Sequence, residues 1–288
     1  MKKKRKQMIV LLIILSVLVL AALVSIIVCT VSIRKTEYSV TMPKLSSDLK
    51  IVCISDLHGW RYGRDNEKLI ELIAQQKPDA ILIAGDMITR GASEKQVSRV
   101  LKLINSLSQI SRVYFAEGNH EADYMEQNGN ELLQRIAAAG ACVVSDSFVD
   151  AEFDGTPLRI GGATGRYFDG TEADVPTLKM LEEIGTQDIA SVAMVHQPEK
   201  ILRCEDRFSW TADLYLSGHT HGGIWGIPGI GGVMAPSQGL FPKYDKGRFT
   251  VDGSIELIIS AGLSGYYFIP RMFNRPEICV IKLKKASY

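Results

Sequence analysis

Five apolar runs of this chain each end in a short motif built from residue types that bind metal ions. The motifs are Asp56-Leu57-His58, Gly85-Asp86-Met87, Gly118-Asn119-His120-Glu121, Val195-His196-Gln197 and Gly218-His219-Thr220-His221. Together they contain all five histidines of the chain. Open α/β sheets bind their ligands beyond the carboxyl ends of the strands. The pattern therefore predicts a fold in which these five strand ends meet at one edge.

From residue 36 onward the chain alternates β-rich apolar runs with helical patterns. Val97, Val100, Ile104 and Leu107 recur at the spacing of one helix face. The runs that we expect to form strands are Tyr38–Met42, Leu49–Ser55, Ala80–Ala84, Arg112–Ala116, Ala141–Val144, Leu158–Ile160, Ser191–Val195, Asp213–Leu216, Glu256–Ser260 and Ile278–Leu283. Such alternation predicts a layered α/β architecture, and no internal boundary is visible. We therefore expect a single domain over residues 36–288.

The N-terminal segment is long and apolar enough to cross a membrane. No charge occurs from Met8 to Ile33, a stretch that would rise about 39 Å as a helix, against the ~30 Å of a hydrocarbon core. Five basic residues precede it at positions 2–6, and Arg34 and Lys35 follow it. We expect residues 1–35 to be a cytoplasmic basic tail and a single-pass anchor in the cell membrane, with the remaining domain extracytoplasmic. A cleaved signal peptide is the alternative, but no A-x-A-like site follows the run.

The charge of the chain argues against a nucleic-acid partner. The first 35 residues hold seven of the 33 basic residues and none of the 32 acidic ones, which leaves residues 36–288 with a formal charge of −6. Such a domain lacks the positive surface that a phosphate backbone requires. Cys53, Cys142, Cys204 and Cys279 are isolated from one another, so we expect buried free thiols rather than a zinc site or a disulfide framework.

The ligand types favour two metal ions over one. The seven candidate ligands are Asp56, His58, Asp86, Asn119, His196, His219 and His221. They are too many for one tetrahedral zinc, but they suit two ions that share the carboxylate of Asp86. The candidate ligands include imidazole and carboxylate groups but no thiolate. Mn, Fe, Zn, Co and Ni all accept such ligands, so the identity of the two divalent ions stays open. His120 is not needed as a ligand. It is therefore placed to protonate a leaving oxygen or to stabilise charge on a phosphoryl group.

Taken in order, these motifs resemble those of the calcineurin-like metallophosphoesterase family. The pattern D-x-H, G-D, G-N-H-[DE], H and G-H-x-H is present, with 30 residues from Asp56 to Asp86 and 33 from Asp86 to Asn119. The resemblance covers residues 46–285 and implies a four-layer αββα sandwich. The segments His196–Glu199 and Gly239–Pro242 look most like the membrane-anchored bacterial phosphodiesterase branch of that family.

The resemblance also implies a role for each residue. The first ion would be held by Asp56, His58, Asp86 and His221, and the second by Asp86, Asn119, His196 and His219. His120 would be the catalytic histidine, and a hydroxide that bridges the ions would be the nucleophile. One position departs from the family pattern. Many members carry an aspartate three positions after the bridging one, where it orients the catalytic histidine, and here that position is Thr89.

We therefore expect a membrane-anchored, metal-dependent phosphohydrolase, in particular a phosphodiesterase that acts on lipid-linked or cell-surface phosphoesters. The aromatic segment Gly265–Pro270 is a candidate contact with the membrane interface, with a buried loop as the alternative. The alternative function is a non-catalytic binding or regulatory protein at the cell surface, built on a phosphoesterase scaffold. The complete ligand set argues against it, because a protein that has lost catalytic activity usually lacks some of the metal ligands.

Overall fold

Two six-stranded sheets form the centre of the protein. The computed structural model describes residues 2–166, 174–265 and 269–286. The first sheet runs β1 (Arg34–Met42), β16 (Glu277–Lys285), β2 (Leu49–Ile54), β3 (Ala80–Ala84), β4 (Arg112–Ala116) and β5 (Ala141–Val143). The second runs β14 (Gly247–Val251), β15 (Ile255–Ile259), β9 (Leu214–Ser217), β8 (Ala190–Met194), β7 (Thr156–Gly162) and β6 (Ser147–Phe153).

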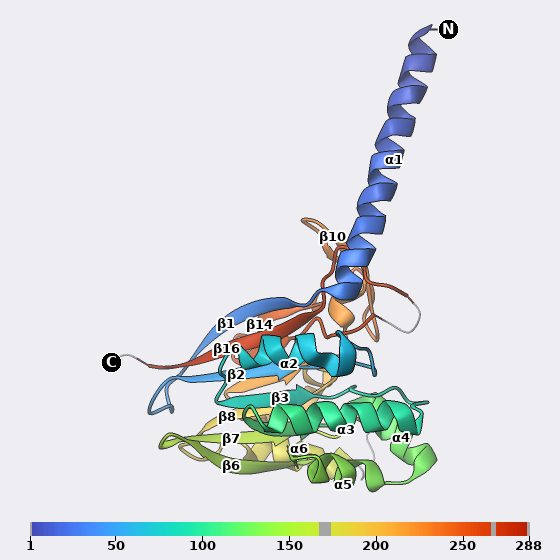
Figure 1. Ribbon diagram of the computed structural model, residues 1–288. Coiled ribbons are helices and arrows are strands. Elements are labelled where there is room, and N and C mark those ends of the chain that lie inside the picture. Colours follow the sequence, from blue (N-terminus) through green and yellow to red (C-terminus); the bar gives the residue numbers. More distant parts are fainter. Residues whose placement is uncertain (1, 167–173, 266–268, 287–288) are drawn as a thin grey trace.

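Helices cover the outer face of each sheet. They are α2 (Glu67–Ala74), α3 (Glu94–Ser108), α4 (Asn119–Asn128), α5 (Glu131–Ala138), α6 (Val175–Glu183) and α7 (Pro198–Arg203). In Figure 1, α2 and α3 lie across the first sheet. Shorter elements are the 3₁₀ turns η1 (Arg64–Asn66), η3 (Glu205–Ser209) and η4 (His221–Gly223), and the two-residue strands β10 (Gly226–Ile227), β11 (Gly231–Gly232), β12 (Met234–Ala235) and β13 (Gly239–Leu240).

Three apolar cores separate four layers. The central core takes side chains from both sheets, among them Ile51, Leu82, Ile160 and Leu216. A second core lies between the first sheet and α2, α3 and α5, and a third lies between the second sheet and α6 and α7. The order helix, sheet, sheet, helix confirms the predicted αββα sandwich.

Apolar runs form the inner parallel strands because both faces of these strands are covered. In β2, Ile51 and Cys53 face the central core, while Val52 and Ile54 face the helices. Apart from β1, which begins earlier than expected, the predicted strands agree with the observed ones to within two residues at each end. The sequence did not predict β6 and β14. Both are antiparallel edge strands that alternate buried with exposed residues, so neither contains a continuous apolar run.

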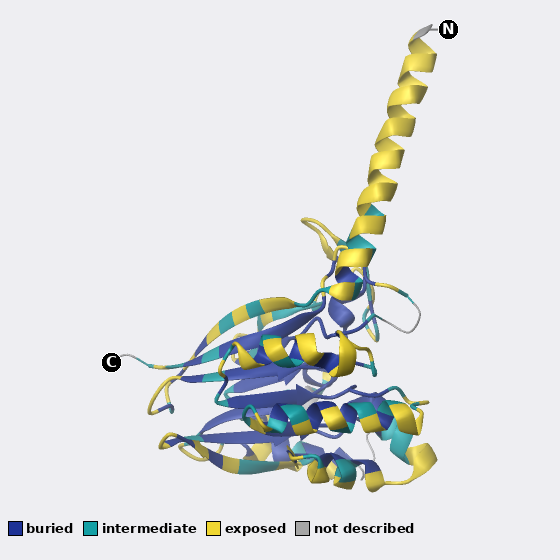
Figure 2. Ribbon diagram, in the orientation of Figure 1, coloured by how far each residue is buried: buried dark blue, intermediate teal, exposed yellow. Residues whose placement is uncertain are grey.

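The helix α1 (Lys2–Val31) projects away from the sandwich, as Figure 1 shows. It is long and apolar enough to span a membrane. Its side chains are exposed along nearly the whole length and become covered only near its C-terminal end (Figure 2). Only Ser32 and Ile33 separate α1 from β1. Arg34 and Lys35 therefore belong to the first sheet rather than to a linker.

Two smaller expectations have mixed outcomes. All five cysteines lie outside disulfides in the described structure, and Cys53 and Cys279 are buried as predicted. The prediction is wrong for Cys142, which is exposed because β5 is an edge strand of the first sheet. Cys204 is only partly buried. Within the candidate interfacial segment, residues 266–268 lie outside the described residues.

Candidate metal centre

The fold brings together six of the seven side chains that the sequence nominates as ligands, and the seventh, Asn119, begins the helix after β4 beside them. Asp56, Asp86 and Asn119 follow β2, β3 and β4 of the first sheet, while His196 and His219 follow β8 and β9 of the second. In each sheet these strands are parallel neighbours, so their carboxyl ends share one edge. The two edges meet, and potential ligand atoms from both sheets lie within 4.8 Å of one another.

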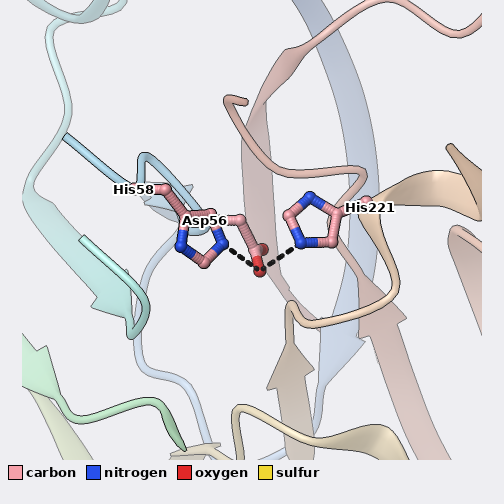
Figure 3. A group of neighbouring side chains, drawn as sticks. All are labelled: Asp56, His58 and His221. Carbon is pink, nitrogen blue, oxygen red and sulfur yellow. Dashed lines mark ion pairs between the residues drawn. The ribbon is translucent and has the colours of Figure 1, made fainter. Parts of the chain in front are cut away.

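One group of three residues could hold a metal ion beside β2. It consists of Asp56, His58 and His221. Nε2 of His58 lies 4.0 Å and Nε2 of His221 lies 3.9 Å from Oδ1 of Asp56. Figure 3 shows the two imidazole rings on either side of this carboxylate, each with a nitrogen turned toward it. The two rings are stacked, with centroids 5.1 Å apart.

A second group of three residues could hold an ion beside β3. It consists of Asp86, His196 and His219, all of them buried. Oδ2 of Asp86 lies 3.1 Å from Nε2 of His196 and 3.7 Å from Nε2 of His58. Asp86 therefore stands between the two groups, where the sequence places the shared ligand.

Five of the seven candidate ligands adopt a left-handed backbone conformation. Asp56, His58, Asp86, His219 and His221 have φ angles of 53°, 47°, 56°, 69° and 49°. A residue with a Cβ atom in this region costs roughly 1–2 kcal/mol. Strain of this kind persists only where the surrounding structure enforces it, and it is concentrated at functional sites.

Two glycines allow the loops after β3 and β4 to touch. Gly85 has a φ of 83°, and a Cβ atom there would lie 2.3 Å from the backbone nitrogen of Gly118. A Cβ atom on Gly118 would lie 2.2 Å from Oδ1 of Asp86. The close approach lets the backbone N–H of His120 donate to the same Oδ1 at 2.8 Å. One carboxylate oxygen of Asp86 is thus held by the backbone, while Oδ2 faces the histidines.

Hydrogen bonds to backbone carbonyls orient two of the imidazoles. Nδ1 of His196 lies 2.6 Å from the carbonyl oxygen of Ala84, and Nδ1 of His221 lies 3.3 Å from that of Ser264. Because a carbonyl only accepts, each Nδ1 carries the proton and donates it. Nε2 is the atom turned toward the carboxylates. Partners of this kind fix the tautomer of metal-binding histidines.

Burial keeps most of the cluster's histidines neutral. It lowers the pKa of His58 and of His221 to about 3, and it lowers that of His219 well below the ordinary value. His196 is different, because burial would lower its pKa but the charge of Asp86 raises it to about 9. Burial also opposes ionisation of Asp86, yet the charge of His196 holds the pKa of Asp86 below its usual range. Without a cation these two residues form an ion pair, and a divalent ion would replace the shared proton.

The unsatisfied atoms of the cluster fit a cation. Among the described residues, Oδ1 of Asn119 and Nε2 of His58 are buried and have no hydrogen-bond partner. Buried polar atoms without partners are rare in folded proteins and require an explanation. An amide oxygen and a neutral imidazole nitrogen, beside two carboxylates, are ligands that divalent transition metals accept.

A backbone N–H group contacts Nδ1 of His120. The N–H of Arg90 donates to Nδ1 of His120 at 3.0 Å. The hydroxyl of Thr89 turns away and donates to Oε1 of Gln96 at 3.0 Å, and Nε2 of Gln96 donates to the carbonyl of His58 at 2.8 Å. Since Nδ1 accepts, the proton of neutral His120 resides on Nε2, which lies 4.0 Å from Oδ2 of Asp86. Burial also lowers the pKa of His120.

Glu121 holds two of the ligand-bearing loops together. It is buried, and its carboxylate accepts the backbone N–H groups of Asp86, Met87, Ile88 and Gly118 at 2.7, 2.7, 3.1 and 2.9 Å. This single side chain therefore supports the loops after β3 and β4. The G-N-H-E motif contains it, but its four backbone partners could not be read from the sequence.

Arg271 and Asn274 support the loop that carries His221. The guanidinium of Arg271 donates to the carbonyls of Ser264 at 2.5 Å and His221 at 3.2 Å, and also to that of Ala261. Nδ2 of Asn274 donates to the carbonyl of His221 at 2.8 Å. Both side chains are buried. Arg271 thus acts on the backbone of this loop.

Comparison with known proteins places this site in a family. The profile of the family described as calcineurin-like phosphoesterase matches residues 49–223, a range that includes every candidate ligand. The chain belongs to this family. Its members generally depend on divalent metal ions, and the protein is accordingly a metallophosphoesterase, a hydrolase that acts on phosphoesters.

Several relatives match over most of the chain. The uncharacterized metallophosphoesterase YkuE of Bacillus subtilis is 27% identical over 271 residues, which cover 88% of this chain and 87% of that protein. The phosphodiesterase YaeI of Escherichia coli is 26% identical over 246 residues, 83% of each chain. The putative metallophosphoesterase F40B5.2 of Caenorhabditis elegans is 31% identical over 83% of this chain but only 49% of its own length.

Among solved structures, the NAD nucleotidase of Haemophilus influenzae has a similar fold. The TM-score is 0.50 at 17% sequence identity, over 75% of this chain and 45% of that one. This likeness concerns the fold alone.

Proposed function

We propose that the protein is a membrane-anchored phosphodiesterase that uses two divalent metal ions and acts on phosphodiesters held at the bilayer surface. The observation that carries the proposal is the convergence of two groups of potential ligands around the carboxylate of Asp86. The similarity to YaeI, which is named a phosphodiesterase, supports a diester as substrate. Mn, Fe, Zn, Co and Ni all remain suitable ions for these ligands.

Each residue of the centre has a proposed part. Asp56, His58, Asp86 and His221 would hold one ion, and Asp86, Asn119, His196 and His219 the other. Two such ions would lower the pKa of a water molecule and neutralise charge on the phosphoryl oxygens. His120 presents the proton of Nε2 toward the same space. It would donate a hydrogen bond to the phosphoryl group or to the leaving oxygen.

The covered end of α1 supports an uncleaved anchor. Cys29 is buried, and the backbone N–H of Phe273 donates to Oγ of Ser25 at 2.6 Å. Cleavage of a signal peptide at the end of the apolar stretch would remove these contacts. We keep residues 1–35 as the proposed tail and anchor and 36–288 as the proposed phosphoesterase domain, with Arg34 and Lys35 already in β1. The excess of basic residues before the uncharged run from Met8 to Ile33 favours an extracytoplasmic domain.

The proposal is tested with the full-length protein in detergent. Metal content is measured after loading with Mn²⁺ or Zn²⁺, and turnover is measured on bis(p-nitrophenyl) phosphate, a diester, and on p-nitrophenyl phosphate, a monoester. We expect two ions per chain, a preference for the diester and loss of turnover after chelation. A single ion per chain would contradict the two-metal centre. A preference for the monoester would contradict the phosphodiesterase assignment.

A further inference from the structure

A cavity joins the candidate metal centre to the end of α1. Its volume is about 260 Å³. Its lining includes His58 and His120 of the candidate metal centre, Cys29 of α1, and Trp60, Leu263 and Pro270. The helix that could anchor the protein is therefore also a wall of the space that leads to the candidate catalytic residues.

Strand pairing explains why α1 ends beside this cavity. β1 is parallel to β16, and β16 is antiparallel to β2. The first residue of β1, Arg34, pairs with Glu277, which lies two residues before the partner of Cys53 in β2. The start of β1 consequently lies at the edge where β2 ends and where Asp56 begins the candidate metal centre.

Several contacts fix the last turns of α1 against the domain. Besides the bond from Phe273 to Ser25, Nη2 of Arg275 donates to the carbonyl of Ile33 at 3.4 Å. Arg34 forms an ion pair with the fully buried Glu277 at 2.8 Å. Cys29 is 4% exposed, whereas Ile27 on the same turn is 61% exposed. The helix thus has one face on the cavity and another that faces outward.

Part of the cavity lining is suited to hydrocarbon. Cys29, Trp60, Leu263 and Pro270 present apolar or weakly polar surface. The one arginine among the described lining residues, Arg271, donates to backbone carbonyls and is buried. It is therefore engaged with the protein rather than placed to bind an anionic group. The lining thus combines side chains of the candidate metal centre with apolar side chains.

Exposed apolar side chains surround the base of α1. Trp225, Ile230 and Phe273 are 41%, 70% and 46% exposed. Trp225 is tied to the wall of the cavity, since its Nε1 donates to the carbonyl of Pro270 at 2.9 Å. In Figure 1 the hairpin of β10 lies beside the lower part of α1. Tryptophan and apolar side chains next to a spanning helix are typical of contact with the membrane interface.

We propose that this cavity binds the hydrocarbon chain of a membrane phosphodiester, which passes along α1 while its phosphate reaches the metal centre. The inference rests on the proposed function. Drawing a lipid phosphate out of the bilayer would expose its first methylenes to water. An apolar wall that continues from the anchor to His58 and His120 removes that cost. Trp60, 44% exposed, would cover the chain at the mouth.

The test uses two esters that share one leaving group. Ethyl p-nitrophenyl phosphate and dodecyl p-nitrophenyl phosphate are compared on the full-length protein in detergent, so that only chain length differs. We expect kcat/KM for the dodecyl ester to exceed that for the ethyl ester by about tenfold or more, the effect of burying about two methylenes. In Cys29→Trp, which fills the cavity beside α1, this ratio should fall toward one. Ile27→Trp places the same bulk on the outward face and should keep the wild-type ratio.

Calorimetry with dodecyl phosphate and ethyl phosphate measures the same preference without turnover. Tighter binding of the dodecyl compound, lost in Cys29→Trp and kept in Ile27→Trp, is the expected result. Equal kcat/KM for the two esters in the wild type, or a dodecyl preference that survives Cys29→Trp, would overturn the lipid-chain site and leave the phosphodiesterase assignment intact. If neither ester is hydrolysed by the metal-loaded protein, the proposed function itself fails.

Discussion

The backbone N–H of Arg90 donates to Nδ1 of His120, at the place where many members of the family orient the catalytic histidine with a carboxylate. The two arrangements place the proton differently. A carboxylate accepts from Nδ1 and stabilises an imidazolium, whereas an N–H donor requires Nδ1 to be unprotonated. His120 is therefore set up to act as a neutral donor through Nε2, in agreement with the lowered pKa.

Removing the imidazole of His120 should slow turnover without removing the metal ions. We expect His120→Ala to lose roughly 10²- to 10⁴-fold in kcat on bis(p-nitrophenyl) phosphate, the usual scale for a positioned proton donor. The loss should be smaller for esters with better leaving groups. Thr89→Ala is the matched control, because Thr89 bonds Gln96 and not His120. Loss of metal from His120→Ala would make His120 a ligand instead.

Asp86→Ala should be the most damaging change among the candidate ligands. Asp86 faces histidines of both groups, so its removal weakens both ion sites at once. His221→Ala removes a residue of the group around Asp56 alone and should leave the second site occupied. The measurement is the metal content of each variant by plasma emission, together with turnover. Retention of two ions by Asp86→Ala would contradict the shared site.

The ligands were predictable because their types and their places after strands are both visible in the sequence. Residues such as Glu121 and Arg271 were not, because their partners are backbone groups of distant loops. The position of α1 beside the site was also unpredictable. It depends on β16 lying between β1 and β2, a pairing that brings residue 277 next to residue 34.

Glu121→Gln tests whether this buried carboxylate supports the metal centre. Glutamine has the same size as glutamate, but its NH₂ group would replace a carboxylate oxygen that accepts backbone N–H groups. Two donors would then face each other without an acceptor. We expect a loss of about 1–3 kcal/mol in the free energy of unfolding and weaker metal binding. Glu131→Gln, on an exposed position of α5, should change neither. The measurements are denaturant unfolding and metal titration of both variants. Wild-type stability and metal affinity in Glu121→Gln would contradict a supporting role for Glu121.

Lys200 should make the stability of the protein depend on alkaline pH. Burial lowers the pKa of its ammonium group from 10.5 to about 8, although Asp146, Glu117 and Asp174 oppose the shift. Between these two pKa values the unfolded chain holds a proton that the folded chain has released, so stability rises with pH. The gain is roughly 3 kcal/mol from pH 8 to pH 10.5. The measurement is the free energy of unfolding of the wild type and of Lys200→Met at several pH values. As the pH rises from 8 to 10.5, the value for the wild type should increase relative to that for Lys200→Met.

The last prediction concerns the side of the membrane on which the domain lies. Residues 2–6 place five positive charges in the first turns of α1, and no residue from Met8 to Ile33 is charged. The two basic residues after it are engaged in the domain, Arg34 with Glu277 at 2.8 Å and Lys35 with Glu37 at 2.6 Å. The charge difference across α1 therefore favours a cytoplasmic N-terminus and an extracytoplasmic domain.

The exposed thiol of Cys142 provides a direct measurement of this topology. Cys53 and Cys279 are buried, and Cys142 lies on the surface of an edge strand. A membrane-impermeant maleimide should label the protein in intact spheroplasts, and Cys142→Ser should lose most of that label. Labelling that appears only in inverted vesicles would place the domain in the cytoplasm. The cavity beside α1 would then open toward the inner leaflet, and lipids of that leaflet would be its substrates. The result thus decides which membrane surface supplies the phosphodiester.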